Sequence, residues 1–98
     1  GALNPQVKAE EGLIRFTWQN NADNMQVMDT DRVLLLAYHP ARQKAVYLID
    51  GNARDSGFQE LPIPSHFKGE ELHCYMAFRN MEKTSASNSQ WLGSIVAV

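Results

Sequence analysis

The residues best suited to chemistry lie together in the segment ELHCYMAFRN, residues 71–80. His73 and Tyr75 flank Cys74, which is the chain's single cysteine, and a run of serines follows a few residues later. A cysteine becomes a nucleophile when a neighbouring base or positive charge lowers the pKa of its thiol. A pair formed by Cys74 and His73 is therefore the first hypothesis to weigh. It depends on whether the two side chains can point toward each other.

The order of residue types in this segment predicts a β-strand from Leu72 to Asn80, because apolar residues recur at every second position. Successive strand residues point to opposite faces of a sheet, so Cys74 points away from His73 and the pair is excluded. We expect Cys74 to behave as an inert, apolar core residue. The predicted core face carries Leu72, Cys74, Met76 and Phe78. The predicted outer face carries His73, Tyr75, Ala77 and Arg79.

Other catalytic and nucleotide-binding motifs are missing from the sequence. The serines at 85, 87 and 89 lack a G-x-S-x-G elbow and a partnered acid, which argues against a catalytic triad. The chain also has no P-loop and no dinucleotide fingerprint. The sequence therefore predicts a protein that is not an enzyme and that carries no cofactor.

The histidines and aspartates of the sequence raise the question of a zinc site and of a calcium site. The separations of the three histidines, at 39, 66 and 73, fit no compact zinc pattern. Clustered carboxylates at one end of a β-sandwich can bind calcium, and Asp23, Asp29 and Asp31 flank one loop. That loop lacks the regular spacing of a calcium motif, and aspartate is common in turns. We expect no metal, although calcium binding by these three residues stays open.

Composition narrows the classes of partner. The net charge of −2 and the pI of about 5.9 argue against nucleic-acid binding, which needs clustered Lys and Arg. No run of about 18 apolar residues is present, so we expect no membrane insertion. With 98 residues, the chain is expected to form one domain spanning 1–98. The location stays open between the cell surface, the exterior and the cytoplasm.

Short apolar segments separated by turn residues predict an all-β fold. The spacing of about ten residues between segments favours an antiparallel, immunoglobulin-like sandwich of about seven strands, of the fibronectin type III kind. Trp18 and Phe78 are expected to be buried between its two sheets. One helical turn is predicted, with Ser65 as its cap, Phe67 as a core plug and Gly69 as its end. The segments read as strands are 13–18, 32–39, 45–49, 58–61, 72–80 and 88–98.

Several segments carry a resemblance to known families. The segment LHCYMAFRN resembles the penultimate strand of an immunoglobulin or fibronectin type III sandwich, and SASNS resembles the turn into the last strand. More specifically, the chain is similar to the C-terminal part of an uncharacterised Bacteroidota family, domain of unknown function 6266. The matching pieces cover nearly the whole chain in order. They are Thr17-Trp18, LLAYHP, KAVYL, Gly51, Ala53-Arg54, LPIPSHFKG, LHCYMAF and SNSQWLG.

This resemblance implies a fold, a bacterial origin and a natural chain that extends upstream of Gly1. It implies no activity, because none is assigned to the family. Phe67 stands where we expect the family to prefer Trp, which is a conservative departure.

One surface stands out from the sequence. The outer face of the 72–80 strand is expected to adjoin the 32–39 strand, which is apolar on both faces. The predicted partner-binding face consists of Tyr47, His73, Tyr75 and Arg79. Its occupant could be a protein partner, the upstream domain, a second copy or a glycan. We therefore expect a non-catalytic interaction or structural module. A carbohydrate-binding module is the first alternative, and an accessory domain of an upstream enzyme is the second.

Overall fold

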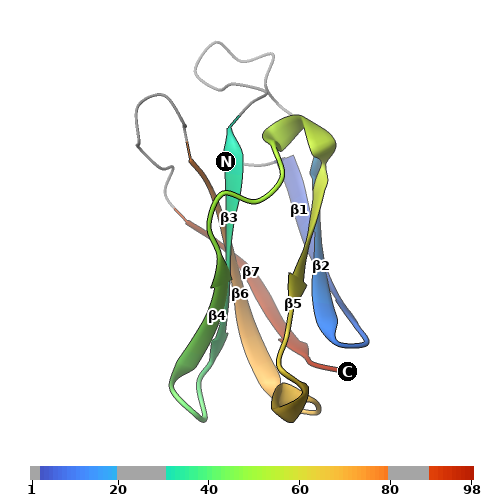
Figure 1. Ribbon diagram of the computed structural model, residues 1–98, viewed down its shortest axis with the longest axis vertical. Helices are drawn as coiled ribbons and strands as arrows, with labels where there is room; N and C mark the ends of the chain where they lie inside the picture. Colours follow the sequence, from blue (N-terminus) through green and yellow to red (C-terminus); the bar gives the residue numbers. More distant parts are fainter. Residues whose placement is uncertain (1–2, 20–30, 80–88) are drawn as a thin grey trace.

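The computed structural model describes residues 3–19, 31–79 and 89–98. These residues form two antiparallel sheets packed face to face, so the predicted all-β sandwich is confirmed (Figure 1). The smaller sheet has the order β1-β2-β5, with β1 at Leu3–Glu10, β2 at Leu13–Gln19 and β5 at Phe58–Pro62. The larger sheet has the order β4-β3-β6-β7. Its strands are β3 at Arg32–His39, β4 at Lys44–Leu48, β6 at Glu71–Arg79 and β7 at Gln90–Val96.

The strand β1 is not revealed by alternation of apolar residues. Its sequence, LNPQVKAE, is mostly polar and contains Pro5, which cannot donate a backbone hydrogen bond. The structure places β1 at an edge of the smaller sheet, where a proline is tolerated. Its pairing with β2 is irregular between Leu3 and Gln6, and Asn4 has a positive φ of 48°. The strand is held by its partner rather than by its own propensity.

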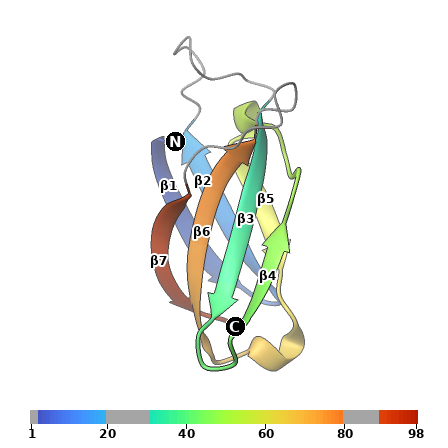
Figure 2. The same cartoon turned by 90° about the vertical axis from the view of Figure 1, so that its left-hand side faces the viewer.

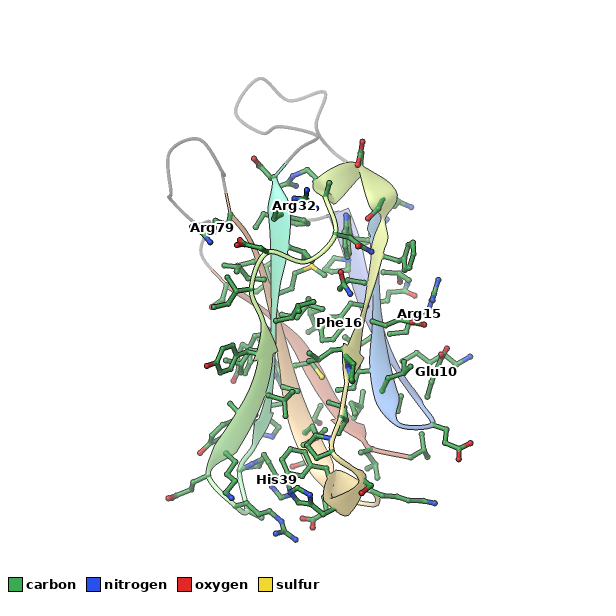
Figure 3. All side chains as sticks on the ribbon, in the orientation of Figure 1. Glu10, Arg15, Phe16, Arg32, His39 and Arg79 are labelled. Atoms are coloured by element: carbon green, nitrogen blue, oxygen red, sulfur yellow. The ribbon has the colours of Figure 1, made fainter. Side chains whose placement is uncertain are left out.

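The core lies between the two sheets, and both alternating strands contribute to it as predicted. On β2, Ile14, Phe16 and Trp18 are buried, and Figure 3 shows Phe16 in the space between the sheets. On β6, the predicted core face is confirmed, because all four of its members are at most 2% exposed. Those members are Leu72, Cys74, Met76 and Phe78. Trp18 and Phe78 meet edge to face, with ring centroids 5.5 Å apart.

The predicted helical turn is a 3-10 turn, η2, at Ser65–Phe67. Phe67 plugs the core, and Gly69 adopts a φ of +82° just beyond the turn, as expected. The assignment of Ser65 as the cap is wrong. The N-cap is Pro64, and no side chain caps the turn, because a turn this short leaves few backbone N–H groups to satisfy.

The calcium hypothesis concerned Asp23, Asp29 and Asp31, of which only Asp31 lies among the described residues. Asp31 is buried, and its Oδ2 lies 3.7 Å from Nε of Arg54. Arg54 is the first residue of the other 3-10 turn, η1, at Arg54–Ser56. Within the described ranges, no group of three or more His, Cys, Asp or Glu side chains could hold a metal ion. The described part of the chain also contains no helix long and apolar enough to cross a membrane.

Candidate binding face

A single row of side chains crosses all four strands of the larger sheet. Tyr75 on β6 is paired with Leu36 on β3 and with Trp91 on β7, while Leu36 is also paired with Tyr47 on β4. Directly paired residues point to the same face of a sheet. The neighbours of Tyr75 on β6, Cys74 and Met76, point into the core, so the row points outward. We call the side of the sheet that carries this row the outward face, and Figure 2 looks onto it.

Trp91 reaches this face because β7 contains a β-bulge. The pairing with β6 shifts between Cys74 and Tyr75, leaving Leu92 as an extra residue. Gly93 lies at the bulge with a φ of +101°, a conformation that favours glycine. Without the extra residue, strict alternation would send Trp91 and Ser94 to opposite faces. With it, Trp91 lies opposite Tyr75 and Ser94 lies opposite His73 on the same face.

The outward face is hollowed beside the aromatic row by an open apolar groove of about 510 Å³. The aromatic ends of the row are strongly exposed, at 63% for Tyr47 and 64% for Trp91. Contiguous apolar surface of this kind commonly marks an interaction site. The side chains that line the groove include Leu34, Leu36, Tyr47, Tyr75, Ala77, Arg79 and Ser89.

Charged groups stand at the two ends of the outward face. Arg32 and Arg79 are direct register partners at the groove end. Nη1 of Arg79 donates to Oδ1 of Asp50 at 2.8 Å, and Nη1 of Arg32 donates to the carbonyl of Gly51 at 3.3 Å. At the other end of β6, Oε1 of Glu71 lies 3.4 Å from Nε2 of His73. On the outward face, the groove end therefore carries two arginines and Asp50, and the opposite end of β6 carries Glu71.

All four residues predicted for a partner-binding face lie on the outward face, and three of them line the groove. Tyr47, Tyr75 and Arg79 line the same groove. His73 shares the outward face but does not line the groove; it lies two residues along β6 and contacts Glu71. Trp91 was missed, although the glycine two residues later within a strand-like segment signals a bulge.

Cys74 is fully buried, and burial raises the pKa of its thiol to about 11. A thiol in this state is a poor nucleophile. We expect Cys74→Ser to destabilise the fold by about 1–3 kcal/mol, because it places a hydroxyl in an apolar site. Urea titration of this variant beside Cys74→Ala, which adds no polar atom, measures the difference. Thiol reagents should label the wild type only after denaturation; rapid labelling of the native protein would contradict the burial.

The most tightly paired titratable groups lie at the far end of the sandwich from the groove. Nε2 of the buried His39 lies 2.7 Å from Oε2 of Glu70, and Nδ1 of His39 accepts the backbone N–H of Arg42. Burial alone would raise the pKa of Glu70, but hydrogen bonds and charges from Arg42 and His39 outweigh it and lower that pKa. The cluster fastens the β3–β4 turn to the segment before β6, which is a structural role.

Comparison with known proteins assigns the chain to a family. The model of the family of unknown function DUF6266 matches residues 1–93. No curated protein matches the chain, and no solved structure matches it. Because the family model covers nearly the whole sequence, the protein belongs to the DUF6266 family.

Proposed function

We propose that this domain is a non-catalytic interaction module that binds a protein through its outward face. The observation that carries the proposal is the continuous row of Tyr47, Leu36, Tyr75 and Trp91 beside an apolar groove. Tyr, Trp and Arg are the side chains enriched at the energetic centres of protein interfaces. Here two tyrosines and a tryptophan belong to the row that crosses the face from edge to edge, and two arginines stand at one end of the face.

The strand order supports a more specific description of the fold. A sheet β1-β2-β5 facing a sheet β4-β3-β6-β7 is the arrangement expected of a fibronectin type III-like member of the immunoglobulin-like sandwiches, and it supports that assignment. Such sandwiches host many unrelated functions, so the function rests on the face and not on the fold. The resemblance of the sequence supports an origin in Bacteroidota.

The chemistry of the described residues supports a non-catalytic role. The groove is lined by one charged side chain, Arg79, which is already paired with Asp50. Figure 3 shows Arg79 and His39 at opposite ends of the molecule, so the His39–Glu70 pair does not serve the groove. Acid–base or nucleophilic catalysis needs such groups within hydrogen-bond reach of one substrate.

A carbohydrate-binding module is the second candidate, because Tyr47 and Trp91 expose their rings on one face. Aromatic rings on a sheet surface can stack on the apolar faces of sugars. A glycan array read with the wild type, Tyr47→Ala and Trp91→Ala separates this candidate. Binding to one glycan class that both variants lose would favour carbohydrate over protein as the occupant.

Photo-crosslinking in the native host tests the proposed function. A photoreactive phenylalanine derivative replaces Tyr47, and a matched variant carries it at Lys8, which is exposed on the smaller sheet. We expect a discrete protein adduct from position 47 that position 8 does not give. Equal adduct patterns, or no adduct from position 47, would contradict a protein-binding role for the outward face.

A further inference from the structure

We infer that the occupant of the outward face is a second copy of this chain, bound about a two-fold axis that runs along the aromatic row. The inference rests on the proposed function, because it names the partner of the same face. Face-to-face pairing about this axis reverses the strand direction and lays each residue of the row over its own copy. Three features of the described residues support this arrangement over others.

The first feature is the symmetry of charge about Tyr75. Arg79 lies four residues to one side of Tyr75 on β6, and Glu71 lies four residues to the other side. At a rise of about 3.3 Å per residue, each lies roughly 13 Å from the row. The axis therefore places Arg79 of one copy over Glu71 of the other. Pairing with parallel strands would instead place the Arg32–Arg79 ends of the two copies together, where four arginines would share only the two Asp50 carboxylates and like charges repel.

The second feature is the complementarity of side-chain size about Leu36. Two residues to one side, Leu34 is paired with Ala77, and this small neighbour belongs to the hollow of the groove. Two residues to the other side, Tyr38 is paired with His73, so two rings stand at that level. The axis lays Tyr38 of each copy over the groove beside Leu34 of the other. In the dimer, the two rings of Tyr38 and His73 on each copy therefore face the groove of the other copy, and this contact occurs twice.

The third feature is that no described residue near the aromatic row places a charged side chain on the outward face, where the second copy would bury it. Lys44, the basic residue nearest to the row on β4, is paired with the buried His39 and therefore points away from the outward face. The four strands average about seven residues, or about 24 Å, and lie about 4.8 Å apart, so they cover on the order of 450 Å² in projection. Stable interfaces bury roughly 800 Å² of accessible surface per partner, so we expect a dimer that depends on protein concentration.

Two serines, Ser94 on β7 and Ser89 directly before it, provide a sharp test of the axis. Ser94 is paired with His73, and Ser89 directly precedes Gln90, the register partner of Met76. Continuing that register by one residue puts Ser89 at the level of Ala77, with which it shares the groove, so the two serines are symmetric about Tyr75. The axis places Ser89 of one copy over Ser94 of the other. Facing sheets lie about 10 Å apart, which is too far for a disulfide but suits a short bismaleimide. The native Cys74 is buried and does not compete.

The experiment mixes Ser89→Cys with Ser94→Cys, adds the bismaleimide and measures the covalent dimer on a denaturing gel. We expect the mixture to give at least several times more dimer than either variant alone, because identical positions are offset by about 13 Å along the strands. Equal yields from the mixture and the single variants would overturn the axis. The lack of any dimer at high protein concentration would overturn the inference.

Exchanging the charges at positions 71 and 79 gives a second test of the dimer that does not use cysteine. We expect Glu71→Arg to weaken the dimer about tenfold, and Arg79→Glu added to it to restore association. Glu11→Arg, at an exposed turn between β1 and β2, makes the same charge change away from the face and should leave the dimer unchanged. Failure of the double variant to recover would count against the Arg79–Glu71 contact. If position 47 crosslinks to a different protein while the serine mixture gives no dimer, the inference fails and the proposed function stands.

Discussion

Trp18→Ala is expected to lower the free energy of unfolding by roughly 3–5 kcal/mol, a large part of the stability of a domain of this size. Trp18 is 5% exposed, and its ring meets Phe78 edge to face. Its Nε1–H donates to the carbonyl of Arg54 at 2.7 Å, so truncation also removes the partner of a buried acceptor. Urea denaturation followed by circular dichroism measures the loss.

The chain's other tryptophan supplies a matched control. Trp91 is 64% exposed on the outward face, so Trp91→Ala should change the stability of the monomer by no more than about 0.5 kcal/mol. The titrations are run at low protein concentration, where association does not contribute. Equal losses from the two variants, or an unchanged denaturant midpoint for Trp18→Ala, would show that Trp18 is not a core residue.

Arg54→Ala is expected to cost about 3–5 kcal/mol, because removing one member of a buried ion pair leaves the other charge uncompensated. Arg54 is 1% exposed, its guanidinium lies 3.8 Å from the centre of the Phe78 ring, and its Nε lies 3.7 Å from Asp31. Burial lowers the pKa of Arg54, and the charge of Asp31 opposes that shift. Thermal and urea unfolding of the variant measure the cost.

Arg15→Ala makes the same substitution at an exposed site. Arg15 pairs with Glu60 at 3.1 Å and lies over the ring of Phe58, but the ion pair is well exposed to solvent. Exposed pairs contribute about 0–1 kcal/mol, so this variant should stay close to the wild type. Comparable losses for Arg15→Ala and Arg54→Ala would contradict a special role for the buried pair.

The sequence predicted those parts of the fold that depend on local alternation. The apolar period in β2 and β6 gave the correct inward faces and placed Cys74 in the core. The strand β1 was not predicted, because its polar, proline-containing sequence forms a strand only through its pairing with β2. The burial of Arg54 was also not predicted. Arginine is ordinarily exposed, and the partners of Arg54, Asp31 and Phe78, are distant in sequence.

The candidate site was predicted in part for a related reason. Alternation gives the face on which a residue lies but not its level along a neighbouring strand, which pairing fixes. The four predicted residues therefore share one face, but the sequence could not show that His73 lies outside the groove that the other three line. Trp91 was missed because the bulge at Gly93 changes the alternation of β7. Both differences arise from strand register, which a single sequence states only weakly.

Association of two copies through the outward face is tested most directly by sedimentation velocity over a wide concentration range. The wild type should shift from the 11.1 kDa monomer toward a dimer as concentration rises. Tyr75→Glu, at the centre of the row, and Tyr47→Glu, at a site exposed enough to spare the fold, should both stay monomeric. A charge buried in a desolvated interface without a partner is costly, and this cost separates the copies. A wild type that remains strictly monomeric at high concentration, or variants that associate as strongly as it does, would contradict the proposed interface.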